Sequence, residues 1–172
     1  MKEYKEIQVA LLGLGTVGLG VYKVLQMQKE EMQHKIGTEI KIKKILVRNL
    51  EKAAGKIEDA SVLTDSWQEI VNDDEIQIVI EVMGGMEPAR TYIMEAMQAG
   101  KQVVTANKDL IAADGKELMD QAKKSGCDLL FEAAVAGAIP IIRPLKQCLA
   151  GNHLSEIMGI VNGTTNFILT KM

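Results

Sequence analysis

The hydrophobic residues of this chain fall into short apolar runs, separated by longer segments in which they recur at helical spacing. Five runs predict buried β-strands: Ile7–Leu12, Ile40–Val47, Ile76–Val82, Gln102–Thr105 and Asp128–Glu132. The segments between them predict helices, strongly over Val17–Gln33, Ala89–Ala99 and Asn107–Lys124 and more weakly over Glu51–Lys56 and Ser66–Val71. Strands and helices that alternate in this way predict an α/β protein built from βαβ units, with a mostly parallel sheet.

Residues 151–172 follow a different pattern. Leu154–Val161 predicts a further strand, and the segment after Asn162–Thr165 starts a helix that is still running at Met172. We therefore expect residues 1–150 to form one domain and residues 151–172 to begin a second, α+β domain. Only the first strand of that second domain is expected here, as in a piece of a longer protein.

Composition narrows the class of protein. The chain has 172 residues, and 47% of them are hydrophobic, which is enough for the core of one domain. A formal net charge of −3 without a basic block argues against nucleic-acid binding. No apolar run is long enough to cross a membrane or to serve as a signal peptide. With only 2 cysteines there is no disulfide framework, so a cytoplasmic protein is expected.

The first predicted strand leads directly into a G-x-G-x-x-G motif, Gly13-Leu14-Gly15-Thr16-Val17-Gly18, which opens a predicted helix. The first glycine permits a tight turn, the second lets a pyrophosphate approach the backbone, and the third lets the helix pack against the strand. This context predicts dinucleotide binding and a Rossmann-type, doubly wound sheet. The alternative is a glycine-rich turn that serves packing alone.

The end of the second strand bears on which dinucleotide binds. An acid that accepts hydrogen bonds from the ribose 2′-OH is typical of NAD sites. This chain has Val47-Arg48-Asn49 there, and the first acid is Glu51. Because a guanidinium can hold a 2′-phosphate, Arg48 favours NADP and leaves NAD as the alternative. The alternative interpretation of Arg48 is an ordinary solvated charge at the end of a strand.

Two more loops lie where parallel strands end. Gly84 and Gly85 follow the third strand and permit close approach of a cofactor, although a plain tight turn explains them nearly as well. Thr105 and Lys108 end the fourth strand, at the edge of the sheet where ligands bind in open α/β folds. Lys108 is either a cation at that crevice or an exposed lysine in a first helical turn.

Four segments together closely resemble homoserine dehydrogenases: Gly13–Gly18, Thr105–Lys108, Phe131–Ile142 and Gly159–Ile168. The resemblance implies NAD(P)-dependent interconversion of L-homoserine and L-aspartate 4-semialdehyde, a step toward threonine, methionine and isoleucine. It implies a homo-oligomeric intact enzyme whose substrate-binding acids and second catalytic lysine lie downstream. This piece is then expected to bind nucleotide, to be catalytically incomplete and to be a monomer.

The resemblance also implies roles for individual residues. It implies that the glycine motif holds the pyrophosphate, Arg48 the 2′-phosphate, and that Lys108 lies at the nicotinamide and substrate. It implies a Na⁺ site made mostly of backbone carbonyls, at Glu132, Val135, Gly137 and Ile139, and a substrate contact at Thr164. An interdomain loop and a helix N-cap are the respective alternatives. Rival functions are another semialdehyde or amino-acid dehydrogenase and a non-catalytic module that senses the redox state of a nucleotide.

Overall fold

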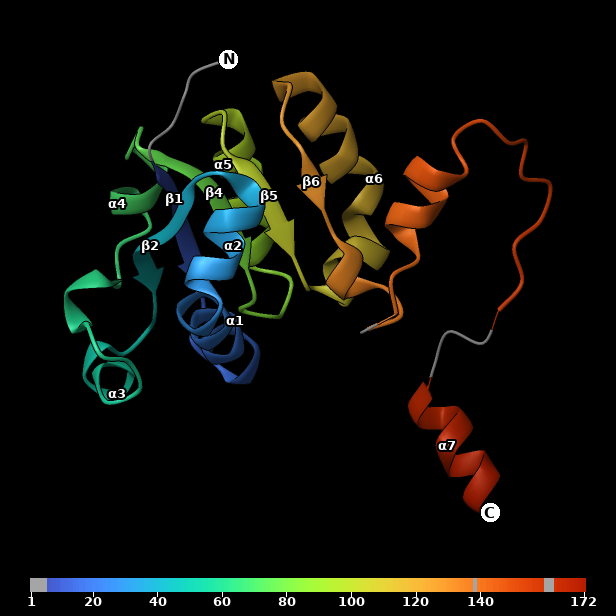
Figure 1. Cartoon of the computed structure of the whole chain (residues 1–172), viewed down its shortest axis with the longest axis horizontal. Helices are drawn as coiled ribbons and strands as arrows, with labels where there is room; N and C mark the ends of the chain where they lie inside the picture. Colours follow the sequence, from blue (N-terminus) through green and yellow to red (C-terminus); the bar gives the residue numbers. More distant parts are fainter. Residues whose placement is uncertain (1–5, 138, 160–162) are drawn as a thin grey trace.

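The computed structural model describes residues 6–137, 139–159 and 163–172, with the side chains of residues 163–165 excepted. In this part of the chain six parallel strands form one sheet with the order β3-β2-β1-β4-β5-β6 (Figure 1). The strands are β1 (Glu6–Leu12), β2 (Glu39–Leu46), β3 (Leu63–Thr64), β4 (Ile76–Glu81), β5 (Gln102–Thr105) and β6 (Leu129–Leu130). The α/β class and the parallel sheet predicted from the sequence are confirmed.

Helices lie between these strands and after the last one. They are α1 (Thr16–Met27), α2 (Lys29–Ile36), α3 (Leu50–Ala54), α4 (Gln68–Val71), α5 (Ala89–Gln98), α6 (Lys108–Ser125) and α7 (Gly163–Lys171), with 3₁₀ turns at Ala60–Val62 and Glu132–Ala134 and a π-helical turn at Pro144–Cys148. The single helix predicted over Val17–Gln33 is wrong, because the chain breaks at Gln28 (φ −104°, ψ 15°). No residue of α2 is buried, so packing does not hold α1 and α2 in one line.

The core has two halves because alternate residues of a strand face opposite sides of a sheet. On β1, Ala10 and Leu12 pack with buried residues of α5 and α6, including Ile93 and Leu118. Leu11, between them, belongs to the other half, which contains residues of α1 and α3. Helices therefore cover both faces of the sheet, and side chains near the strand ends are placed between them.

The strand predicted over Leu154–Val161 is absent from the residues that the structure describes. Residues 154–159 are irregular and exposed, and residues 160 and 161 lie outside the described part. A strand needs a neighbour to satisfy its backbone groups, and no described segment pairs with residues 154–159. Figure 1 shows α7 away from the sheet, and its Phe167, Ile168 and Leu169 are exposed.

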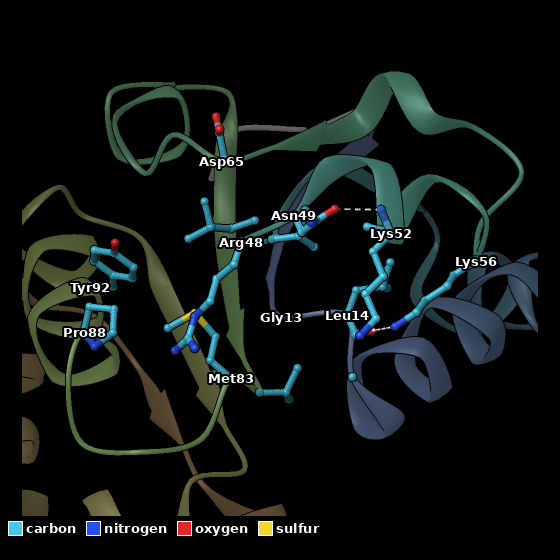
Figure 2. A pocket seen from close by; sticks show the side chains of 15 residues that line it. Gly13, Leu14, Arg48, Asn49, Lys52, Lys56, Asp65, Met83, Pro88 and Tyr92 are labelled. Carbon is cyan, nitrogen blue, oxygen red and sulfur yellow. Dashed lines mark hydrogen bonds between the residues drawn. The ribbon is translucent and has the colours of Figure 1, made fainter.

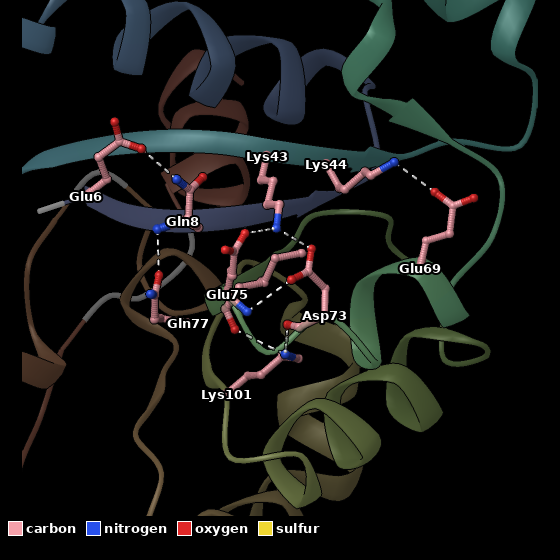
Figure 3. Close-up of polar contacts among 10 residues, drawn as sticks. Glu6, Gln8, Lys43, Lys44, Glu69, Asp73, Glu75, Gln77 and Lys101 are labelled. Carbon is pink, nitrogen blue, oxygen red and sulfur yellow. Dashed lines mark hydrogen bonds and ion pairs between the residues drawn. The ribbon is translucent and has the colours of Figure 1, made fainter. Parts of the chain in front are cut away.

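Polar contacts tie together the segments that lead into β4 and β5 (Figure 3). Lys43 on β2 pairs with Asp73, at 2.6 Å, and with Glu75. The ammonium of Lys101, which is only 3% exposed, donates to the carbonyl oxygens of Asp73 and Ile76 at 2.7 and 3.1 Å. Burial lowers the pKa of Lys101. These contacts fix the amino ends of the strands and leave the carboxyl ends open.

Candidate functional site

The turn from β1 into α1 requires glycine at two positions. Gly13 has a φ of +101°, and a Cβ on it would lie 3.1 Å from backbone atoms of Val82 and Met83. A Cβ on Gly18 would lie only 2.0 Å from the carbonyl oxygen of Gly13. The missing side chains thus let α1 start directly behind the turn, against the segment that follows β4.

The N-terminus of α1 is open to solvent. Gly15 precedes the helix without a side-chain cap, and a Cβ on it would meet no atom within 4 Å. Thr16 and Val17 are exposed, and the first turn of the helix contains no acidic residue. The first N–H groups of a helix lack intrahelical partners and carry partial positive charge. This end of α1 can therefore hold a phosphate group.

A cavity of about 580 Å³ adjoins the turn, where β1, β2 and β4 end (Figure 2). Its walls come from Gly13–Gly15, from the segment that connects β2 to α3, and from residues between Val82 and Tyr92. The central strand β1 has β2 on one side and β4 on the other, so chain connections leave it in opposite directions. In open α/β sheets, ligands bind at the carboxyl ends of the strands at this position.

Three cations line the cavity: Arg48, Lys52 and Lys56. None of them has a carboxylate within 4.0 Å among the described residues, although Asp65 also lies in the wall. Lys56 donates to the carbonyl oxygen of Leu14 at 3.1 Å. Figure 2 shows Arg48 extending toward the opposite wall and Lys56 beside the glycine turn. The cavity thus presents uncompensated positive charge to an anion.

Sequence reasoning found Arg48 and missed the two lysines. Asn49 caps α3 by accepting from the backbone N–H of Lys52 at 2.8 Å, so the short helix starts at the cavity. Arg48 precedes α3 and Lys56 follows it, so the three cations do not share a helix face, and the fold brings them to the same cavity.

The residues predicted at the ends of β4 and β5 lie along the same edge of the sheet as the cavity, but they do not line it. Gly84 and Gly85 are exposed, with φ of +74° and +77°, so glycine is needed there for the turn itself. Lys108 is exposed at the first position of α6. Thr105 is fully buried and donates to Glu81 at 2.6 Å, so its hydroxyl faces protein.

The Glu132 carboxylate has a role that the sequence did not reveal. It accepts the backbone N–H groups of Ile141, Ile142 and Arg143 at 2.5, 2.9 and 2.9 Å. The hydrogen bond from Ile141 is the main reason why the pKa of Glu132 is lowered, and burial acts in the opposite direction. A carboxylate has about four acceptor positions, so three protein donors leave room for one further contact.

The remaining predicted site residues are those of the Na⁺ site and Thr164. Val135, Gly137 and Ile139 lie in the loop that Glu132 anchors, and their carbonyl oxygens are hard donors of the kind Na⁺ prefers. Within the described residues, no three His, Cys, Asp or Glu side chains group as metal ligands. The side chain of Thr164 lies outside the described part.

No described helix is both long and apolar enough to span a bilayer.

The strand order, the glycine turn and the cationic cavity define a Rossmann domain of the dinucleotide-binding class. Comparison with known families makes the assignment specific. Residues 13–132 match the model of the NAD-binding domain of homoserine dehydrogenase, and residues 140–172 match the homoserine dehydrogenase model. The chain belongs to the homoserine dehydrogenase family, and the resemblance seen in the sequence is confirmed.

Individual relatives agree. The homoserine dehydrogenase of Bacillus subtilis is 49% identical over 98% of this chain and 39% of its own length. A crystal structure of the enzyme from Thiobacillus denitrificans superposes with a TM-score of 0.88 at 47% identity, covering 98% of this chain and 39% of that one. A hyperthermophilic archaeal homoserine dehydrogenase in complex with NADPH superposes with a TM-score of 0.80 at 29% identity, over 96% and 56% of the two chains. The present chain thus spans about two fifths of the length of its bacterial relatives.

Proposed function

We propose that this chain is the NADP-binding part of a homoserine dehydrogenase, which interconverts L-homoserine and L-aspartate 4-semialdehyde. The cavity at the end of β2 carries the proposal, because it joins an open helix N-terminus to cations without acidic partners. The backbone of Gly13–Gly18 holds the pyrophosphate. Arg48, with Lys52 and Lys56 nearby, holds the 2′-phosphate, which NAD lacks.

The reactive half of the cofactor is proposed to lie at the ends of β4 and β5. NADPH supplies the hydride for the aldehyde carbon. Gly84 and Gly85 allow its ribose and nicotinamide to approach the backbone, while Lys108 stabilises the negative charge that develops on the aldehyde oxygen. Loss of turnover in a Lys108→Ala variant of the intact enzyme, with NADPH binding kept, tests this role.

Na⁺, the substrate contact of Thr164 and the division at residue 150 remain proposals as well. Glu132 has one acceptor position left, and the carbonyl oxygens of Val135, Gly137 and Ile139 are suitable donors. Exposure of residues 151–159 supports a domain boundary near 150. The cytoplasmic location, homo-oligomerisation of the intact enzyme and its place before threonine, methionine and isoleucine remain predictions from the sequence.

Calorimetric titration of this chain with NADPH and with NADH tests the cofactor. NADPH is expected to bind more tightly, and Arg48→Ala is expected to weaken NADPH binding by about 10- to 100-fold. A hydrogen bond to a charged group contributes about 1.5–3 kcal/mol, which sets this range. NADH binding is expected to change little.

Lys116→Ala is the matched control, because Lys116 is an exposed cation of α6 outside the cavity lining. It removes the same charge and is expected to leave both affinities unchanged. Equal affinity for the two nucleotides in the unsubstituted chain, unaffected by Arg48→Ala, would overturn the NADP assignment.

A further inference from the structure

Glu81, the last residue of β4, is a buried acid that the proposed chemistry does not use. Its exposed fraction is 0%, and no described lysine or arginine lies within 4.0 Å of its carboxylate. A buried carboxylate without hydrogen bonds is strongly unfavourable, so its contacts decide what it does. The donors lie at the carboxyl ends of β4 and β5: two in the loop after β4 and one on the last residue of β5.

The first carboxylate oxygen of Glu81 organises the loop after β4. It accepts the backbone N–H groups of Met83 and Gly84, at 2.8 and 3.3 Å. The second oxygen accepts the hydroxyl of Thr105, at 2.6 Å, from the neighbouring strand β5. Glu81 and Thr105 are paired in the parallel ladder, so the two side chains meet at the strand ends.

Thr105 and Asn107 extend the contacts to the start of α6. The hydroxyl of Thr105 accepts the backbone N–H of Asn107 at 3.0 Å. Asn107 caps the helix by accepting from Leu110 at 3.2 Å, and its side-chain amide donates to the carbonyl oxygen of Gly85 at 2.7 Å. Together with the backbone between Gly84 and Gly85, these hydrogen bonds form a closed circuit that joins the loop after β4 to the start of α6. Lys108, the first residue of α6, follows immediately.

We propose that Glu81 is a positioning residue, which holds the Met83–Gly85 loop and the start of α6 in the geometry that the nicotinamide half of the cofactor requires. The inference rests on the proposed function. A dinucleotide spans the switch point, with its adenosine half on the β2 side and its nicotinamide half on the β4–β5 side. Only the β4–β5 side depends on these hydrogen bonds. Breaking them should therefore weaken binding of the nicotinamide half and leave binding of the adenosine half unchanged.

The experiment compares two ligands: NADPH, and adenosine 2′,5′-bisphosphate, which keeps the adenine, ribose and 2′-phosphate but has no nicotinamide. Glu81→Gln replaces an acceptor with a donor toward Thr105 at constant shape. It is expected to weaken NADPH binding by about tenfold, as when the loop geometry that binds the nicotinamide half is populated about one tenth of the time. Binding of the bisphosphate is expected to stay within about twofold.

Thr105→Val removes the hydrogen bond to Glu81 from the β5 side and is likewise expected to weaken NADPH binding without weakening bisphosphate binding. This variant tests the proposal even if Glu81→Gln does not fold. Glu87→Gln is the control, since Glu87 is an exposed acid on the same loop whose contact is with Thr91. Equal losses for both ligands in folded variants, or no loss for either, would overturn the positioning role. An unsubstituted chain that binds neither ligand would instead overturn the proposed function, and the role of Glu81 with it.

Discussion

The glycine turn makes a sharp prediction about two glycines of α1. In Gly18→Ala the new Cβ would lie 2.0 Å from the carbonyl oxygen of Gly13, and contacts below 3.0 Å do not persist, so the turn must move by about 1 Å. Overpacking of this kind costs about 1–3 kcal/mol. Gly20 lies two residues further along the helix, is exposed, and would place its Cβ in open space. Gly20→Ala is therefore expected to stabilise the protein by about 0.5–1 kcal/mol through helix propensity.

Both substitutions add one methyl group to the same helix, so the difference between them isolates the contact with the turn. Urea unfolding can be followed through Trp67, the one tryptophan of the chain, which is buried and stacked on Tyr92 with ring centroids 4.5 Å apart. A loss of about 2 kcal/mol in Gly18→Ala corresponds to a fall in Tm of roughly 4–8 °C. NADPH affinity is expected to fall as well, because the displaced backbone is the proposed pyrophosphate site. If Gly18→Ala unfolds and binds like Gly20→Ala, the steric argument is refuted.

Two further predictions concern other parts of the chain. Burial, with a smaller contribution from Asp128, raises the pKa of the Cys127 thiol, so Cys127 is expected to react with Ellman's reagent at pH 8 much more slowly than the exposed Cys148. Cys148→Ser is expected to remove the fast phase, and a fast phase that survives would contradict this. The lowered pKa of Glu132 stabilises the fold above the ordinary value of about 4.3, and this stabilisation is lost as the pH falls through the lower folded-state value. The Tm of the unsubstituted chain is thus expected to fall more steeply than that of Glu132→Gln between about pH 5 and pH 3, and parallel curves would show that the carboxylate is not held as described.

The strands and the glycine turn could be predicted because local pattern and tertiary environment agree there. Leu11 and its neighbours are apolar on both sides of β1, as a strand covered by helices on both faces requires. The break at Gln28 could not be predicted, because neither glycine nor proline marks it. The strand expected at Leu154–Val161 failed for another reason. Its apolar pattern is real, but pairing depends on a neighbouring strand that the described chain does not contain.

The candidate site also has a part that could be predicted from the sequence and a part that could not. The glycine turn could be predicted from its motif, because only glycine fits there. The prediction of the side chains that line the cavity was incomplete, because Lys52 and Lys56 resemble any surface lysine in the sequence. Only the fold places them in the cavity wall. Glu81 gave a signal that was available in the sequence. An acid at the end of the apolar run Ile76–Ile80 is either at the surface or held by specific donors, and the structure shows the second.

The two sides of the switch point use charge in opposite ways, and this suits a ligand whose halves have different tasks. On the β2 side, the cations of Arg48 and Lys52 have no acidic partner among the described residues, so their attraction is available to an anion such as the proposed 2′-phosphate. On the β4 side, Glu81 is buried and its carboxylate accepts hydrogen bonds from protein donors, so it fixes the geometry of the loop and does not contact the ligand. In the proposed site, binding energy from the adenosine half can then hold the nicotinamide half against the hydrogen-bonded loop after β4. Such a division favours reaction because binding energy from the non-reacting part of a ligand orients the reacting part.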